Sequence, residues 1–524
     1  MANSYDIIAI GSGHNGLVAA AYMAQAGKKV LVLERNPWFG GGVVTRELTK
    51  PGFKHDQHSM AHIFIRANPL LKNDELGLYS KFGLKYIVPE MPMISVFEDG
   101  TSLAMYKDRE RTVAEIAKFS KKDAESYRRF ADMAATWLPM IQSSLYAPPV
   151  PLGASYAMMD QSKEGRELWK VMQLSCHDLL SSFFENEKVI MHFGRIAGEN
   201  LVSPDEKATG IGPFVFVGFL ESLGIGVPVG GSGALTQALI DSIKSNGGEV
   251  VGSAPVEQVL VKNGRAAGVV TADGKEIMAK DGVIGAIHPH HIGKMVPGLA
   301  PDVVKAAENT QITDAACITI HAALNEPLKF KCGDHVKAVM IELLPNSYNT
   351  MRKSFDNLRY GGFTDPPLIG LGSLTMHDPS RAPAGKATMH VWDYVPFKRA
   401  DGKSWDETKT QYAERMLEHM RKYISNLGPE NIIAYHCDSP VDMERTSPSF
   451  RHGDLHGIAM TTYQNGSHRP TPDLGMGKVP GCDRLYLVGP FQHPGGGVFG
   501  AGRAAAMKMC EDLKIDFDKI GKKK

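Results

Sequence analysis

The sequence predicts an α/β fold in which a Rossmann-like nucleotide-binding domain is interrupted by long insertions that form an α+β domain. The first supporting observation is an apolar strand, a glycine-rich turn and a helix close to the start of the chain. The second is a pair of later blocks, near the middle and the end, with strands, glycines and a helix of their own. The third is the length, because 524 residues exceed what a single hydrophobic core usually serves.

The opening block has the parts of a dinucleotide-binding βαβ unit. Residues 7–10 are an apolar run typical of a parallel strand, and Gly11, Gly13 and Gly16 follow in the order G-x-G-x-x-G. The first glycine permits the turn, the second lets the backbone approach a diphosphate, and the third lets the helix pack on the strand. The helix N-terminus offers N–H groups to the phosphates. Glu34 ends the next strand, where a carboxylate accepts hydrogen bonds from a ribose.

Two further blocks complete the predicted nucleotide domain. A helix over 234–245 precedes short strands joined by turns at Asn263-Gly264 and Asp273-Gly274, and the strand RLYLVG precedes a last glycine-rich turn and helix. The long segments between the blocks then belong to a second domain. We therefore expect a discontinuous nucleotide-binding domain of residues 1–70, 228–300 and 480–524, and a substrate domain of residues 71–227 and 301–479.

Together these blocks resemble the phytoene desaturase and carotenoid isomerase-like branch of the flavin amine oxidase superfamily. The segments that carry the resemblance are GSGHNGLVAAAYMAQAGKKVLVLER, GGGVVTRE, PGFKHDQHSMAH, PVGGSGALTQAL and LYLVGPFQHPGGGVFGAGRAAA. The resemblance implies FAD as the cofactor, held in a domain of the glutathione reductase and amine oxidase type. Pro490 departs from the pattern, because many related flavoproteins have an acidic residue there.

The resemblance also implies which residues hold FAD. The diphosphate is expected at the opening glycines, the adenosine ribose at Glu34 and its neighbour Arg35, and the adenine at the backbone of Val256. The flavin and its ribityl chain are expected beside two later glycine clusters. The residues assigned to these clusters are Gly41, Gly42, Thr45, Gly489, Gly497 and Val498.

Histidines near the expected flavin are the candidates for proton transfer. His55, His58 and His62 lie within GFKHDQHSMAH, a stretch that lines the cavity in the related family. Their spacing could suggest a metal site, but no further ligands follow, so no metal is predicted. For His55 a hydrogen-bonded structural role is preferred, whereas His58 and His62 are candidate catalytic residues. His493 in FQHPGGG either transfers a proton or binds a backbone group, and the two alternatives stay open.

The insertions contain segments whose roles the sequence leaves open. Residues 112–140 and 408–427 have helical spacing, and the strand 389–396 is either core or cavity wall. The apolar segment 209–230 is expected to be a buried helix at the domain interface, with a membrane-dipping or partner-binding surface as the alternative. The histidines of AIHPHHIG, residues 288–291, are expected on a solvated turn.

Composition limits the function classes. A formal net charge of +1 argues against nucleic-acid binding. Six scattered cysteines and the absence of a signal-peptide pattern predict a cytoplasmic protein with reduced thiols, with peripheral membrane contact and a homodimer left open. The first hypothesis for the reaction is dehydrogenation of an apolar, terpenoid or alicyclic substrate, with O2, a quinone or another compound as electron acceptor. The alternatives are a flavin-dependent isomerase or saturase and a non-catalytic lipid-binding escort protein.

Overall fold

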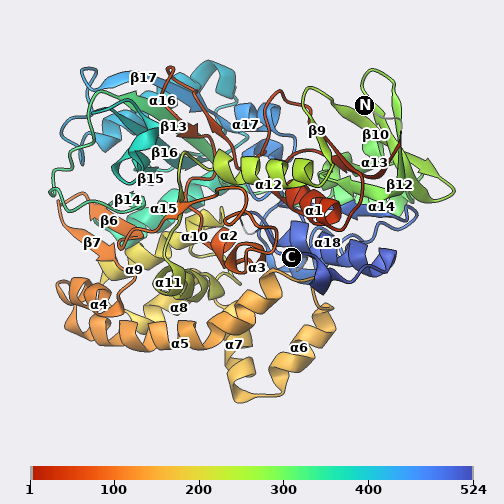
Figure 1. Ribbon diagram of the computed structural model, residues 1–524. Helices are drawn as coiled ribbons and strands as arrows, with labels where there is room; N and C mark the ends of the chain where they lie inside the picture. Colours follow the sequence, from red (N-terminus) through yellow and green to blue (C-terminus); the bar gives the residue numbers. More distant parts are fainter. Residues whose placement is uncertain (1–3, 498, 522–524) are drawn as a thin grey trace.

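The computed structural model describes residues 4–497 and 499–521. The strand β1 (Ser4–Ile10), the helix α1 (His14–Gln25) and the strand β2 (Val30–Leu33) form the βαβ unit expected at the start of the chain. β1 and β2 are parallel and buried, and Ile7 pairs with Val30. Mixed α/β architecture with a Rossmann-like sheet is therefore confirmed (Figure 1).

The first sheet collects strands from three distant parts of the sequence. Its order is β10-β11-β12-β1-β2-β9, and a further strand, β18, pairs with β12. The chain turns from β10 to β11 at Asn263 and Gly264, whose φ angles of 52° and 70° fit the expected two-residue hairpin. The strands added after β2 are β9 (Glu249–Val251), β10 (Val256–Lys262), β11 (Arg265–Thr271), β12 (Glu276–Gly285) and β18 (Leu485–Leu487).

Three helices pack around this sheet, with α1 between the other two. The helices α12 (Gly233–Ser245) and α18 (Gly500–Leu513) both contact α1. The approach of α18 to α1 requires Gly502, because a Cβ there would lie 2.4 Å from the carbonyl oxygen of Asn15. A shared core of aliphatic side chains joins these helices to the sheet. The helices thus pack against the sheet next to the carboxyl ends of its strands, where the glycine turns lie.

The second sheet is the framework of the inserted part. Its order is β17-β13-β16-β15-β14-β6-β7, and α16 (Trp405–Met420) packs on one face. Alternate residues of its central strands face this helix, and the others face the opposite side. The strands are β6 (Met93–Phe97), β7 (Ser102–Met105), β13 (Ala316–Leu324), β14 (Met340–Leu344), β15 (Ile369–Gly372), β16 (Ala387–Val395) and β17 (Ile432–Asp438).

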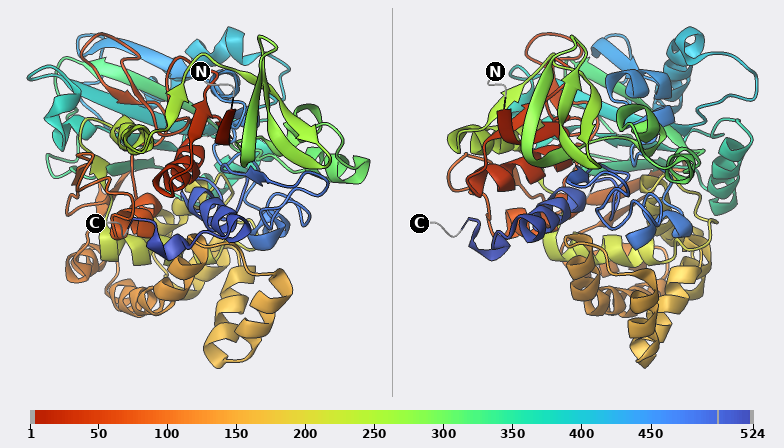
Figure 2. Two further views of the ribbon diagram at one scale, coloured as in Figure 1. Left: turned by 45° about the vertical axis from the view of Figure 1, so that its right-hand side comes forward. Right: turned by 90° about the vertical axis from the view of Figure 1, so that its right-hand side faces the viewer.

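A layer of helices covers the other face of the second sheet. The expected helix over 112–140 is two helices, because Ser120 accepts a hydrogen bond from the backbone N–H of Asp123 and begins a new one. Two of these helices, α6 and α7, form a hairpin that projects from the body in every view (Figures 1 and 2). The helices are α4 (Arg109–Ala117), α5 (Lys121–Leu145), α6 (Leu152–Asp160), α7 (Lys163–Gln173), α8 (Cys176–Phe183), α9 (Glu187–Gly194), α10 (Ile196–Glu199), α11 (Ile211–Leu223) and α15 (Tyr348–Arg359).

Short elements connect the two sheets. Small two-stranded pairs, β3 with β4 and β5 with β8, join the opening block to the inserted part. The boundaries of the two domains remain a prediction, because the strands of each sheet come from several parts of the chain. The short elements are β3 (Thr45–Arg46), β4 (His55–Asp56), β5 (Tyr86–Ile87), β8 (Val227–Pro228), α2 (Phe64–Ala67), α3 (Pro69–Lys72), α13 (Ile292–Met295), α14 (Pro301–Glu308) and α17 (Pro440–Thr446).

The apolar segment 209–230 lies inside the protein. Most of α11 is buried, including Phe214, Val217 and Phe219, so its interpretation as an exposed membrane-dipping surface is wrong. Exposed large apolar side chains are found on the α6–α7 hairpin, and they include Met158 and Trp169. No helix within the described residues combines the length and the hydropathy needed to cross a bilayer.

Candidate functional site

Two glycine segments meet backbone to backbone at the N-terminus of α1. Gly11 has a φ of +84°, and a Cβ on Gly16 would lie 2.9 Å from the carbonyl oxygen of Gly11. Gly40 forms a bridge with Gly13, and a Cβ on Gly41 would lie 3.0 Å from the Cα of Gly13. A Cβ on Gly13 itself would meet no described atom within 4 Å. The turn is therefore tightly packed on one side and open at Gly13, where a ligand can approach the backbone.

Glu34 lies at the end of β2 and faces the same turn. Its carboxylate accepts hydrogen bonds from the backbone N–H and hydroxyl of Ser12, both at 2.8 Å, and from the N–H of Asn36 at 2.9 Å. The N–H of Ala254 donates to the carbonyl of Glu34 at 2.8 Å, which brings the start of β10 at Val256 next to it. The structure thus places together the residues expected at the adenosine end of the cofactor.

The remaining predicted cofactor residues divide into two groups. Arg35 is exposed and donates to the carbonyl of Arg445 at 3.3 Å. Thr45 uses its hydroxyl to donate to Asp56 at 2.6 Å and to accept from the N–H of Gly233 at 2.8 Å, so it ties β3 to the start of α12. Gly41 lies against Gly13 of the opening turn, Gly42 faces the ring of Phe450, and Gly497 lines the cavity. Gly489 lies beside Phe491 on the closing loop, and Val498 lies outside the described residues.

The opening turn suits an anionic dinucleotide. Among the described side chains none caps the N-terminus of α1, and no acidic residue occupies its first turn. Buried polar atoms without a described hydrogen-bond partner also lie in its first turn: both ring nitrogens of His14 and the side-chain nitrogen of Asn15. Buried polar atoms usually have partners, so these groups point to a bound polar ligand. Gly11, Gly13, Gly16 and Glu34 would hold the diphosphate and ribose there.

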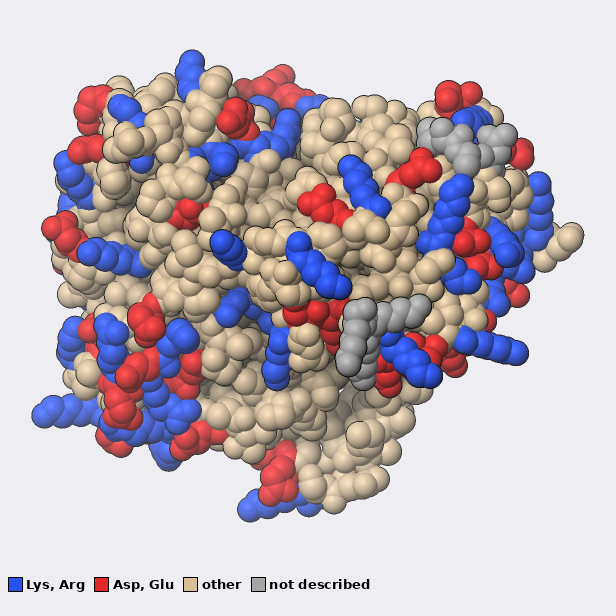
Figure 3. All heavy atoms as spheres, in the orientation of Figure 1, with Lys and Arg blue, Asp and Glu red and all other residues tan. Residues whose placement is uncertain are grey.

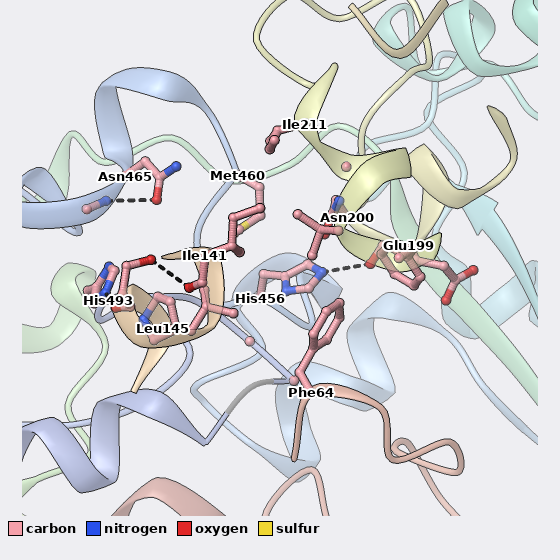
Figure 4. A pocket seen from close by; sticks show the side chains of 18 of the residues that line it. Phe64, Ile141, Leu145, Glu199, Asn200, Ile211, His456, Met460, Asn465 and His493 are labelled. Carbon is pink, nitrogen blue, oxygen red and sulfur yellow. Dashed lines mark hydrogen bonds between the residues drawn. The ribbon is translucent and has the colours of Figure 1, made fainter. Parts of the chain in front are cut away.

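A cavity of about 1000 Å³ lies between the segment 58–64, the closing glycine turn, the second sheet and the helical layer. The sheet contributes alternate residues of two strands, and the helices α5, α6, α7 and α11 contribute apolar side chains. Figure 4 shows Phe64, Ile141 and Met460 around this space. The sheet residues that line it include Cys317, Thr319, His390, Trp392 and Tyr394. The predicted strand 389–396 is therefore a wall of the cavity.

Two of the three candidate catalytic histidines line the cavity. His58 packs its ring on Phe450, with centroids 5.0 Å apart, and neither ring nitrogen has a described partner. Burial lowers the pKa of His58 to about 4, so the ring is neutral near pH 7. Nε2–H of His493 donates to the carbonyl of Ser144 at 2.8 Å, and its Nδ1 has no partner within the described chain. Burial also lowers the pKa of His493.

The third candidate, His62, lies outside the lining of the cavity. Its Nδ1 is 2.8 Å from the hydroxyl of Tyr86, and its Nε2 is 3.1 Å from the hydroxyl of Ser232. Burial lowers its pKa to about 3. With both nitrogens engaged, the ring joins the segment after β4 to the turn before α12. The structure thus gives His62 a structural environment and does not bring it to the substrate space.

A buried charged network supports the wall of the cavity. Nη1 of Arg195 lies 3.0 Å from Oε1 of Glu199, and its Nε lies 3.0 Å from Oε2 of Glu342. Arg195 also donates a hydrogen bond to the hydroxyl of Tyr394. Nε2–H of His456 donates a hydrogen bond to the backbone carbonyl of Glu199 at 2.9 Å (Figure 4). Sequence reasoning missed these residues, because no local pattern indicates that they meet. Because Glu199 is paired with Arg195, it presents little uncompensated negative charge to the cavity.

A second buried arginine organises the closing loop. Arg469 donates to carbonyl oxygens from two segments, including that of Pro490 at 2.9 Å and that of Ile458 at 3.1 Å. Its pKa is lowered to about 10 by burial. Pro490, where related flavoproteins have an acidic residue, thus serves as a backbone acceptor that fixes the loop leading to His493. No local sequence pattern indicates that Arg469 is buried and binds the closing loop.

Comparisons with known proteins agree with this geometry. The family model described as flavin containing amine oxidoreductase matches residues 16–509. The chain belongs to this family. It is therefore a flavin-dependent oxidoreductase, and the expected relationship to the phytoene desaturase and carotenoid isomerase-like branch is confirmed.

Relatives cover almost the whole chain. A limonene dehydrogenase component of Castellaniella defragrans is 26% identical, over 98% of this chain and 95% of that protein. Pyridine nucleotide-disulfide oxidoreductase domain-containing protein 2 of Mus musculus is 29% identical, over 97% and 94%. The fold also matches the crystal structure of an oxidoreductase from Methanosarcina mazei, with a TM-score of 0.63 and 18% identity over 96% of this chain and 99% of that one.

Proposed function

We propose that the protein is an FAD-dependent dehydrogenase that desaturates a carbon–carbon bond of a neutral alicyclic or terpenoid substrate. The observation that carries the proposal is the chemistry of the cavity lining. Among the described lining residues there is no lysine or arginine, and the acidic ones are Glu164 and Glu199. Since Glu199 is paired with Arg195, the inner cavity offers no strong site for a charged substrate group.

The size and position of the cavity support a hydrocarbon-like substrate. A volume of about 1000 Å³ is at the upper end for small-molecule sites. Trp392, Met340 and Phe216 line it and favour an apolar ligand by excluding water. The limonene dehydrogenase of Castellaniella defragrans points to the same class, because limonene is an alicyclic terpene.

The residues of this chain have assigned roles in the proposal. The bound flavin would supply the hydride acceptor, which oxidises one carbon of the substrate. His58 and His493 line the cavity as neutral rings, and each has a ring nitrogen able to accept a proton. The apolar walls hold the substrate in one orientation and keep water out. FAD rather than a smaller flavin is proposed because Glu34 and the start of β10 form a site for an adenosine.

The entry route is proposed to run past the α6–α7 hairpin. Tyr156 and Met158 line the cavity and are also exposed, with exposed fractions of 40% and 65%. An apolar substrate would reach the cavity over this surface, from a membrane or from a partner protein. On the face shown in Figure 3 the charged residues of both signs are interspersed, with no wide area of one sign. The electron acceptor is proposed to be O2, a quinone or a partner redox protein.

The decisive experiment is an anaerobic titration of the purified protein followed by visible absorption. Mass analysis of the released cofactor identifies FAD. We expect an alicyclic terpene to abolish the flavin absorbance and to yield a product two hydrogens lighter, whereas a primary amine of similar size leaves the spectrum unchanged. Reduction by amines alone would refute the proposal. A product of unchanged mass would indicate an isomerase, and a protein that stays colourless after FAD is added would favour the lipid-binding escort function.

A further inference from the structure

Three histidines lie side by side on three neighbouring strands of the second sheet. In the antiparallel register, His321 of β13 pairs with His390 of β16 on one side and with His436 of β17 on the other. Directly paired residues project to the same face of a sheet, with Cβ atoms about 5 Å apart. The ring centroids are 4.5 Å apart for His390 and His321, and 6.4 Å apart for His321 and His436. We call these three residues the histidine row.

The histidine row connects the cavity with the protein surface. His390 is one of the residues that line the cavity, and His321 is fully buried. β17 is the edge strand of the sheet, and the side chain of His436 is 38% exposed. Its Nε2 lies 2.9 Å from Oδ1 of Asp438. One end of the row thus faces the substrate space, and the other end faces solvent and a carboxylate.

The inner rings have unused hydrogen-bonding capacity. Nδ1 and Nε2 of His321 and Nδ1 of His390 are buried and have no hydrogen-bond partner within residues 4–497 and 499–521. Other buried histidines, such as His419, also have a ring nitrogen without a described partner, so it is the alignment of three rings from the cavity to the surface that sets the row apart. The centroid distance of 4.5 Å between His321 and His390 is short enough for a direct N–H···N hydrogen bond in a suitable orientation of the two rings. The distance of 6.4 Å to His436 suits one bridging water molecule.

Charges of both signs face the histidine row from the elements packed against it. Burial is the main reason why the pKa of His390 falls to about 3 and that of His321 falls well below its usual value. Both rings are therefore neutral at rest, and a neutral imidazole can accept a proton on one nitrogen while it donates from the other. The surrounding titratable and charged groups include Lys54, His55, Asp56, His58, Arg46, Arg381 and Asp438.

We propose that the histidine row carries the proton of substrate oxidation from the cavity to solvent. The inference rests on the proposed function, in which a CH–CH unit becomes C=C: two C–H bonds break and one π bond forms. One hydrogen leaves as a hydride, with both electrons, to the flavin. The other leaves as a proton to His390, passes through His321, and is released to water from His436. His58 and His493 also line the cavity, each with a ring nitrogen that has no described partner, and in the proposed route His390, rather than either of these rings, passes the proton on to solvent.

The first test compares His321→Gln with His419→Gln by anaerobic stopped flow. Glutamine fills similar space but does not take up a proton near neutral pH. His419 of α16 is the matched control, because it is also buried and its Nε2 has no described partner. Flavin absorbance reports hydride transfer, and a pH indicator in weak buffer reports proton release. We expect release to slow about 100-fold in His321→Gln and to lag behind flavin reduction, with no lag in His419→Gln. Equal release in wild type and His321→Gln, or an equal lag in both variants, overturns the proposal.

The second test needs no substrate. In the flavin-loaded protein with ¹⁵N-labelled imidazoles, NMR reports which ring nitrogen carries the proton. In a connected row, His436→Gln shifts the ring resonances of His321 and His390, whereas His419→Gln does not. Unshifted resonances overturn the proposed route whatever the substrate. A linked row in a protein whose flavin no terpene reduces would refute the proposed function and leave the proton route supported.

Discussion

The open space at Gly13 predicts that alanine substitutions at Gly13 and Gly16 have different effects: Gly13→Ala weakens cofactor binding, whereas Gly16→Ala lowers the stability of the fold. Gly13 has φ −59° and ψ 153°, a conformation that alanine adopts, and an added Cβ meets no described atom within 4 Å. Gly13→Ala should therefore leave the free energy of unfolding of the cofactor-free protein within about 0.5 kcal/mol of wild type. Gly16→Ala places a Cβ 2.9 Å from the Gly11 carbonyl oxygen and should cost about 1–3 kcal/mol of stability.

Flavin binding, unlike folding, should be sensitive to Gly13→Ala. If the diphosphate lies against this backbone, the new methyl group overpacks the contact by about 1–3 kcal/mol and raises the Kd for FAD about 5- to 150-fold. Quenching of FAD fluorescence measures the Kd, and urea unfolding of the cofactor-free protein measures stability. A Gly13→Ala variant that binds FAD as tightly as wild type would show that the diphosphate does not approach this turn.

Four further predictions concern other parts of the molecule. Glu34→Gln should raise the Kd for FAD about 10- to 150-fold in the same titration, because charge-assisted hydrogen bonds are worth about 1.5–3 kcal/mol. Arg381→Met should lower the free energy of urea unfolding by about 3–5 kcal/mol, since it leaves the buried carboxylate of Asp56 unpaired. Burial lowers the folded-state pKa of His192 to about 3, against about 6.5 when unfolded, so the unfolded chain binds more protons below pH 6.5. The free energy of urea unfolding should therefore fall by about 2 kcal/mol for this ring as the pH drops from 7 to 5, and His192→Phe should reduce this pH dependence. Met158→Ser should raise the KM for an apolar substrate roughly fivefold with an unchanged kcat, measured by steady-state kinetics, because it removes about 1 kcal/mol of apolar contact at the cavity mouth.

Features that depend on neighbouring residues could be predicted from the sequence. The turn at Gly11 and the hairpin at Asn263-Gly264 require positive φ angles at or beside a glycine, and the structure has them there. The strand, glycines and helix of the opening block likewise form a local unit. The same local reasoning placed residues 288–291 on a solvated turn, and this was wrong for His288. That ring is buried and bonds to the carbonyl of Gly457 at 2.7 Å, because a distant loop covers the turn.

Features that depend on the pairing of distant segments could not be predicted. Arg195 and Glu342 are far apart in sequence, and each would be read as a surface charge, yet they form a buried pair. His321 and His436 lie on strands whose neighbours are fixed only by the whole sheet. Single residues of these types occur throughout the chain. The register that selects them is set by side chains elsewhere in the sheet.

The register of β13 and β16 connects stability with function in one argument. Met389 and Val391 face the core under α16, whereas His390 and Trp392 face the cavity. Because side chains alternate along a strand, shifting β16 by one residue would move Met389 and Val391 into the cavity and His390 and Trp392 into the core. The cost of burying a histidine without partners under α16 then opposes the shift. The strand register that buries Met389 and Val391 under α16 is thus the same register that presents His390 to the cavity and aligns it with His321.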